Sequence, residues 1–321
     1  MPHDRISFGA AALPEPERAW LAAAERLPIE SIWQGGHILP TRPTGEAVTR
    51  LALMAAWTER VRVGTAILLL PLYHPVVVSK QLVDLDARTG GRITVGVGVG
   101  GEFPHEYEAV GVPLSERGPR LDESMELLRL LWSGKPVTYH GRFYRLDDVE
   151  LRPVAVPEAT APAQSGGPPL VVSGRKEPAM RRAARFGDGW MPYLMSPGAY
   201  ARSVQTIKDE AERIGRDLAN FEWMMYLYCS VRRDSDRARE DVATFLRGAY
   251  GDKPGAMLER IAPAGAPEDV ARRLQEYVDA GVRHFVISPA SAGDTLDVVT
   301  VAAEEVLPRL TLPSGAAPTT S

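Results

Sequence analysis

The sequence of 321 residues contains one cysteine, Cys229, and lacks blocks of charge of one sign. One cysteine excludes a disulfide within the chain and a metal site made of several thiolates, which fits a reducing cytoplasm. Lysine and arginine total 37 against 41 acidic residues, a net charge of −4. Because nothing in this balance would neutralise a phosphate backbone, we expect no nucleic-acid partner.

Long apolar stretches are missing as well. Residues 1–12 show no basic segment followed by an apolar core, and prolines at positions 71 and 75 interrupt the longest uncharged stretch. We therefore expect neither a secretion signal nor a membrane-spanning helix, and we expect a cytoplasmic protein. The composition is otherwise that of a globular protein, 45% hydrophobic and 24% charged, which allows a sizeable core.

Short β-branched runs alternate with helical patterns along most of the chain. Strands are expected at 6–9, 31–33, 61–68, 92–98, 170–173, 189–191, 221–231 and 284–287. Helices are expected at 15–27, 46–60, 75–88, 116–132, 177–186, 197–214, 235–249, 267–280 and 295–307. About eight strands, each followed by a helix, predict an α/β fold of the (β/α)8 TIM-barrel type. A doubly wound sheet is the alternative, because periodicity does not show whether a sheet closes.

The alternation is interrupted in the middle of the chain. Residues 137–151 predict a hairpin around a His-Gly pair, and residues 153–169, rich in proline, alanine and glycine, predict a surface loop. We therefore expect one domain over residues 1–312, with an insertion at about 135–169 and a tail at 313–321.

In such a barrel the active site lies where the strands end, so the residues after each strand are the candidates for chemistry. His37 follows the second expected strand, and its imidazole can exchange a proton near neutral pH. An ordinary loop histidine is the alternative. His284, at the start of a strand, is typical of a structural residue.

Runs that contain small residues, at 64–71 and 96–101, lead from the third and fourth strands into the loops that follow. Glycines remove Cβ atoms and let a ligand approach the main chain. Core packing explains the first run equally well, and the second lacks the acidic residue that completes a Rossmann fingerprint.

Ser173-Gly174-Arg175 stands between a buried strand and a helix. Helix amides, a glycine and an arginine suit a phosphate, although a plain strand-to-helix turn fits as well. The sequence has no histidine, aspartate and glutamate spacing typical of metal ligands and no G-x-S-x-G nucleophile elbow. We expect no metal.

Several of these segments together resemble the luciferase-like monooxygenase superfamily, in particular its branch of deazaflavin (coenzyme F420)-dependent oxidoreductases. The segments that carry the resemblance are 62–67, 74–75, 80–81, 90–100, 116–123, 132–137, 140–144, 185–190 and 280–286. The resemblance covers most of the chain, and it implies a barrel that binds F420, or alternatively FMN, at the carboxyl ends of its strands.

The resemblance also implies roles for individual residues. His37 corresponds to the position beside the reacting ring carbon, and the Ala66-Ile67 peptide bond corresponds to one that is often cis in the family. The cofactor-binding residues that follow from it are Thr65, Ala66, Ile67, Gly98, Val99, Gly100, Ser173, Gly174 and Arg175.

Two departures from the family pattern bear on the substrate. Relatives that oxidise sugar phosphates or alcohols usually have an acidic residue just before the histidine, where this chain has Gly36. They also have a glutamate where this chain has Gly101, with Glu102 one place later. These differences argue against a sugar-phosphate substrate and leave His37, with Glu102 as a helper, as the expected catalytic residues.

The resemblance thus implies an F420-dependent oxidoreductase that transfers a hydride between the deazaflavin and a small organic substrate. One alternative is an FMN-dependent monooxygenase that uses oxygen and receives reduced flavin from a separate reductase. Another is a flavin-binding barrel without catalysis. The resemblance further implies a homodimer.

Overall fold

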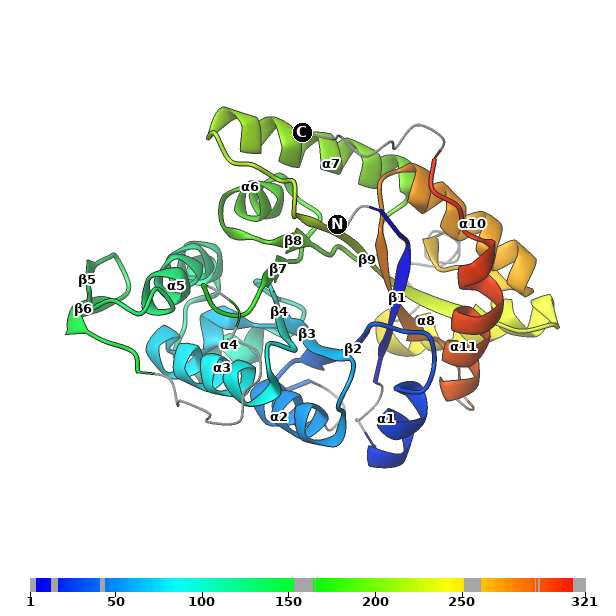
Figure 1. Cartoon of the computed structure of the whole chain (residues 1–321), viewed down its shortest axis with the longest axis horizontal. Coiled ribbons are helices and arrows are strands. Elements are labelled where there is room, and N and C mark those ends of the chain that lie inside the picture. Colours follow the sequence, from blue (N-terminus) through cyan, green and yellow to red (C-terminus); the bar gives the residue numbers. More distant parts are fainter. Residues whose placement is uncertain are drawn as a thin grey trace. The chain divides into compact units, whose positions relative to one another are not determined.

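The computed structural model describes residues 4–12, 17–40, 44–152, 164, 166–250, 261–291, 293 and 295–313. Its fold is a (β/α)8 barrel (Figure 1). The strand order is β9-β11-β1-β2-β3-β4-β7-β8, and a further pairing of β8 with β9 closes the sheet. The predicted barrel is therefore confirmed over the doubly wound sheet, which would leave its two end strands unpaired.

The barrel strands are β1 (Ser7–Ala11), β2 (Ser31–Gly36), β3 (Arg62–Leu68), β4 (Ile93–Val97), β7 (Leu170–Val172), β8 (Gly189–Trp190), β9 (Glu222–Val231) and β11 (His284–Pro289). The main helices are α1 (Arg18–Ala24), α2 (Ala47–Trp57), α3 (Pro75–Thr89), α5 (Arg117–Leu131), α6 (Glu177–Phe186), α7 (Pro197–Arg213), α8 (Ser235–Tyr250), α10 (Pro267–Asp279) and α11 (Thr295–Val301). Most strand residues are buried, as expected where a parallel sheet is covered on both faces.

Three features differ from the expectations or add to them. Strand β2 extends to Gly36, so the histidine at position 37 directly follows it. A short helix, α4 (Pro104–Ala109), and a two-residue strand, β10 (Ala264–Gly265), were not expected, because elements of this length show no periodicity. Most of the expected loop at 153–169, the expected tail beyond residue 313 and the start of the first expected helix at 15–16 lie outside the described residues.

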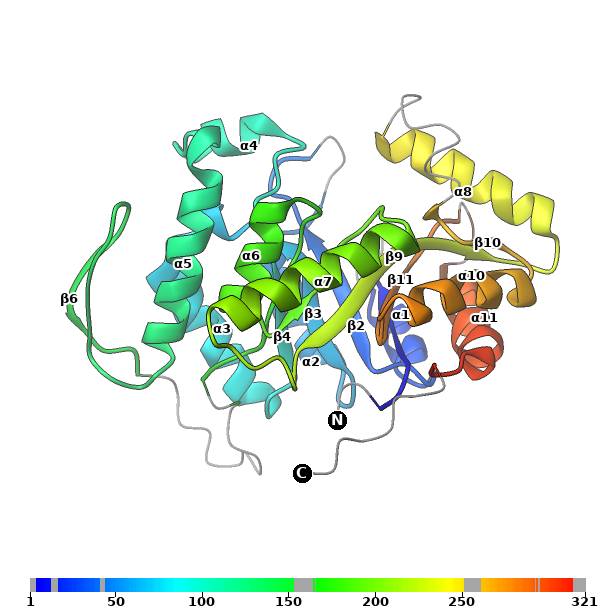
Figure 2. The same ribbon diagram turned by 90° about the horizontal axis from the view of Figure 1, so that it is seen from above.

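The chain divides into two compact units, residues 34–172 and residues 1–33 with 173–321. The expectation of a single domain stays a prediction. In the unit 34–172, the predicted hairpin is present as the antiparallel strands β5 (Val137–His140) and β6 (Arg145–Val149), drawn beside α5 in Figure 2. The buried Glu123 carboxylate of α5 accepts hydrogen bonds from the Phe143 and Tyr144 amides at 3.1 and 2.9 Å, which fixes the hairpin turn to the helix.

In the other unit, a buried polar network joins the starts of three strands. The His284 ring lies 2.7 Å from the Ser7 hydroxyl through Nδ1 and 2.7 Å from the Ser31 hydroxyl through Nε2. The Trp33 indole also donates to the Ser31 hydroxyl, at 2.7 Å. A Cβ on Gly9 would lie 2.2 Å from that hydroxyl oxygen, so only glycine leaves room for the network. His284 therefore has the structural role expected from its position.

Candidate functional site

The candidate proton-handling residue, His37, occupies the first position after β2, at the edge of the sheet where barrel active sites lie. Its Nδ1 lies 2.9 Å from Oε2 of Glu106 in α4. The Glu106 side chain is completely buried, whereas that of His37 is 32% exposed. The His37 ring also lies nearly perpendicular to the Phe103 ring, with centroids 4.8 Å apart. The imidazole is thus held on one side and exposed on another.

The second oxygen of Glu106 binds the main chain next to the histidine. Its Oε1 accepts hydrogen bonds from the amides of Ile38 and Leu39, both at 2.8 Å. The Leu39 carbonyl is in turn 2.6 Å from Nε2 of His105 on the same helix. Helix α4 therefore fixes both the ring of His37 and the chain that follows it.

Glu106 is the site residue that sequence reasoning missed. It is separated from His37 by 69 positions, and α4 is too short for periodicity to show which of its acidic residues is buried. The expected helper, Glu102, is exposed, and its role stays a prediction.

The end of β3 shows the irregularity that the family resemblance implied. The Ala66-Ile67 peptide bond is cis, and the register between β3 and β4 shifts between Thr65 and Leu68. Ala66 and Ile67 are half-buried between buried neighbours. The Thr65 hydroxyl is buried and donates to the Gly96 carbonyl at 2.8 Å, so it holds β3 against β4. Ala66 and Ile67 are therefore the residues at the carboxyl end of β3 that a ligand can reach.

The glycine-rich turn after β4 is the next expected segment. Gly98 is buried, whereas Val99 and Gly100 are half-buried. Gly100 has a φ of 54°, and a Cβ there would lie 2.8 Å from a Leu69 methyl carbon. The buried Tyr107 hydroxyl donates to the Val99 carbonyl, and burial raises the pKa of Tyr107, so the hydroxyl remains a donor.

Close backbone contacts bring the ends of β2, β3 and β4 together. A Cβ on Gly36 would lie 2.3 Å from the Ile67 carbonyl oxygen, and one on Gly96 would lie 2.0 Å from the Thr65 carbonyl oxygen. The His37, Ala66-Ile67 and Gly98–Gly100 segments are therefore neighbours within the unit 34–172.

The expected phosphate turn, Ser173-Gly174-Arg175, belongs to the other unit. Gly174 has a φ of 129°, and a Cβ there would lie 2.6 Å from that of Ala179, so the turn requires glycine. The Gly174 carbonyl accepts a hydrogen bond from the Trp190 indole at 3.0 Å. The exposed Arg175 lies over the Tyr193 ring, 4.9 Å from its centroid, and donates to the Leu194 carbonyl at 3.2 Å. Helix α6 begins two residues later.

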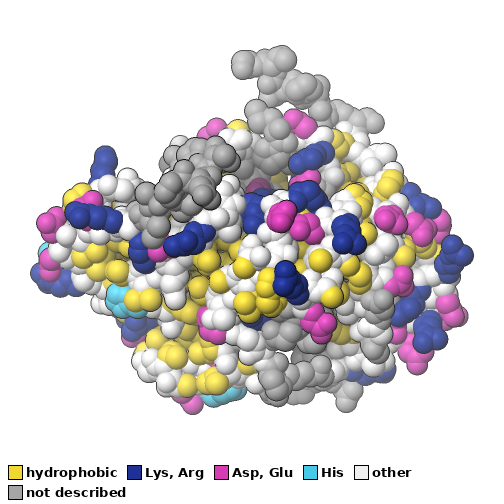
Figure 3. All heavy atoms as spheres, turned by 60° about the horizontal axis from the view of Figure 1, so that its bottom comes forward, with side chains coloured by type: hydrophobic (Ala, Val, Ile, Leu, Met, Phe, Trp, Pro, Cys, Tyr) yellow, Lys and Arg dark blue, Asp and Glu magenta, His cyan; other side chains and the backbone are white. Residues whose placement is uncertain are grey.

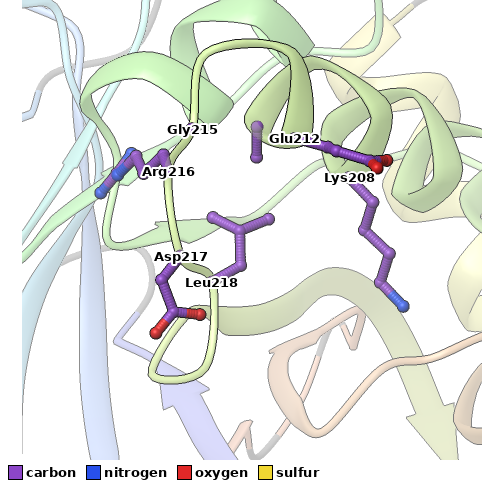
Figure 4. A pocket seen from close by; sticks show the side chains of 7 residues that line it. Lys208, Glu212, Gly215, Arg216, Asp217 and Leu218 are labelled. Carbon is purple, nitrogen blue, oxygen red and sulfur yellow. The ribbon is translucent and has the colours of Figure 1, made fainter.

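A surface hollow of about 450 Å³ lies elsewhere, beside the segment that leads into β9 (Figure 4). Its lining includes Arg216 and Lys208. The Arg216 guanidinium donates to the carbonyls of Ala184 and Gly187 at 2.8 and 2.6 Å, and so it caps the end of α6. Because the hollow is at the amino end of a barrel strand, it is not the expected place for an active site.

Other kinds of site have little support in the described part of the chain. There, no group of three or more histidine, cysteine or acidic side chains could hold a metal ion, and no helix has both the length and the apolar character needed to span a membrane. Burial raises the pKa of the Cys229 thiol to about 12, so it stays protonated at neutral pH. Basic and acidic side chains are interspersed on the face drawn in Figure 3.

The chain is similar to several known proteins. The family model of the luciferase-like monooxygenases matches residues 7–284. An F420-dependent glucose-6-phosphate dehydrogenase of Nakamurella multipartita is 29% identical, with 95% of this chain and 96% of that protein covered. A 4-hydroxyprotoasukamycin monooxygenase of Streptomyces nodosus subsp. asukaensis is 30% identical, with 86% and 77% covered. The structure of an F420-dependent secondary alcohol dehydrogenase with an F420-acetone adduct has a similar fold, with a TM-score of 0.81, 21% identity, and 96% and 99% covered.

Proposed function

Since the chain belongs to the luciferase-like monooxygenase family, we propose that it is a coenzyme F420-dependent oxidoreductase. In this proposal it transfers a hydride between the deazaflavin and a small organic substrate. The observation that carries the proposal is the contact of His37 with the buried Glu106 at the carboxyl end of β2, next to the half-buried backbone of Ala66 and Ile67. The names of a dehydrogenase relative and of a structural neighbour support F420 as the cofactor.

In the unit 34–172, the residues present fit the planar ring of a cofactor. The half-buried residues Ala66, Ile67, Val99 and Gly100 offer apolar contact with a ring. In the other unit, Gly174 and Arg175 stand just before α6, and the exposed Arg175 guanidinium suits a phosphate. A deazaflavin, when bound, supplies or accepts the hydride at its C5 carbon.

The chain's own residues then position the reactants and handle the proton. Because Nδ1 of His37 is engaged by Glu106, the exchange of a proton with the substrate falls to Nε2. Phe103 and the two amides held by Glu106 limit the movement of the ring and its loop. This arrangement contributes to catalysis by orientation.

Titration of the purified apoprotein with F420 and, separately, with FMN tests the cofactor. We expect saturable binding of F420. Tight binding of FMN without binding of F420 would overturn the proposal.

A second candidate is an FMN-dependent monooxygenase that receives reduced flavin from a separate reductase. It is favoured by Gly36, which replaces the acidic residue usual in dehydrogenase relatives and whose contact with Ile67 leaves no room for a side chain. The monooxygenase relative supports it too. Oxygen consumption with reduced FMN would identify this activity, whereas F420 binding without turnover of any compound in a substrate panel would identify a binding protein.

The setting of the enzyme is also a proposal. We place it in the cytoplasm, as a homodimer that acts on a small molecule. Sedimentation of the purified protein tests the dimer, and fractionation of the cells that make it tests the location.

A further inference from the structure

The contact between Glu106 and His37 has a chemical consequence, because a carboxylate and an imidazole have different hydrogen-bonding capacities. Three nitrogen atoms face the two oxygens of Glu106: the amide nitrogens of Ile38 and Leu39 at Oε1, and Nδ1 of His37 at Oε2. A carboxylate with this set of neighbours acts only as an acceptor. The proton of a neutral His37 ring must then be on Nδ1.

We infer that Glu106 is a positioning residue that selects the Nδ1–H tautomer of His37 and so leaves the lone pair of Nε2 as the base of the site. The hydrogen bond of one ring nitrogen decides which nitrogen carries the proton. When the reaction runs in the opposite direction, the doubly protonated His37 ring donates the proton on Nε2 to the substrate. The catalytic part of this inference rests on the proposed function, whereas the tautomer is a property of the protein alone.

A purely structural role for Glu106 would be to hold the chain after His37 through the Ile38 and Leu39 amides. An experiment can separate this role from the selection of the His37 tautomer. In Glu106→Gln, the amide oxygen can still accept the Ile38 and Leu39 amides, while the amide nitrogen donates to Nδ1. His37 must then accept at Nδ1 and carry its proton on Nε2. The substitution thus reverses the tautomer and keeps the loop contacts.

Long-range proton–nitrogen NMR on the histidine-labelled apoprotein, at a pH where the ring is neutral, tests the inference. The His37 signals are assigned from their loss in His37→Ala. We expect the Nδ1–H tautomer in the wild type and the Nε2–H tautomer in Glu106→Gln. The matched control is Glu108→Gln, the same substitution at an exposed position of α4, which should behave as the wild type. The Nε2–H tautomer in the wild type, or no change in Glu106→Gln, would overturn the inference.

Kinetics with bound cofactor test the catalytic part. A misplaced proton should lower kcat of Glu106→Gln by about 100- to 10,000-fold, while KM changes little because no substrate contact is removed. A reversed tautomer with unchanged kcat would overturn this part.

If the protein binds neither F420 nor FMN, the proposed function fails and the NMR result still decides the tautomer. If Glu106→Gln does not fold, the wild-type tautomer alone decides.

Discussion

Gly36 and Ile67 approach each other so closely that a Cβ on Gly36 would lie 2.3 Å from the Ile67 carbonyl oxygen. The neighbouring Gly35 has more room, since a Cβ there would lie 4.0 Å from the Ala66 carbonyl oxygen. Of these two adjacent glycines of β2, only Gly35 has room for a side-chain Cβ. This packing leaves no room for an acidic side chain directly before His37.

The contact predicts that an acid cannot simply be restored at this position. We expect Gly36→Ala and Gly36→Asp to lower the free energy of unfolding by about 1–3 kcal/mol, because backbone must move to admit the side chain. Gly35→Ala is the matched control and should cost much less. Urea unfolding of the three variants measures the difference, and equal costs at positions 35 and 36 would contradict the prediction.

His37→Ala removes the proposed proton-handling group. We expect kcat to fall by about 100- to 10,000-fold, with cofactor binding retained, because the ring is held by Glu106 and Phe103 rather than by the backbone segments proposed to contact the cofactor. Steady-state kinetics at saturating substrate and a cofactor titration measure the two quantities. Unchanged turnover would remove the proposed role of His37.

Arg175→Ala tests the phosphate turn. A charged hydrogen bond to a phosphate contributes about 1.5–3 kcal/mol, so Kd for F420 should rise about 10- to 100-fold. The side chain is exposed, so stability should hardly change. Arg181→Ala, at an exposed arginine of α6 paired with Glu177, is the control for loss of one positive charge. The same loss of affinity in both variants would show that the effect is not specific to the turn.

The burial of Asp86 predicts that the free energy of unfolding depends on pH. Its buried carboxylate binds the Gln164 side chain at 2.9 Å. Burial raises the pKa of Asp86 above its ordinary value of 3.8, more than its hydrogen bonds lower it. The folded state therefore holds this proton more tightly than the unfolded state. Its contribution to stability is complete below pH 3.8 and is lost as the pH rises through the folded-state pKa.

The comparison with Asp86→Asn isolates this contribution. The stability of the wild type minus that of Asp86→Asn should decrease as the pH rises from about 4 and then level off. Urea unfolding at a series of pH values gives the slope, which is independent of any constant difference caused by the amide. A difference that grows with pH would contradict the prediction.

Local patterns predicted the regular elements well and the short ones poorly. Helix α6 has the predicted bounds, 177–186, because Pro178 and Gly187 mark its ends. Helix α4 and strand β10 were missed, since six or two residues do not show a period. The closure of the sheet depends on which strands pair, and hydrophobic periodicity does not predict strand pairing.

The sequence by itself determined where the expected site residues lie relative to the strands, because local hydrophobic patterns predict the order of strands and helices. Strand ends were predicted at His37, Ala66-Ile67, the 98–100 turn and the 173–175 turn. Only the tertiary structure decided which carboxylate meets His37. Glu102 and Glu106 are four residues apart in one polar segment, but only Glu106 is buried. His37 and Glu106 are 69 positions apart, so their contact forms only when the segments that carry them pack together. That packing involves the whole unit and is not encoded in any local pattern.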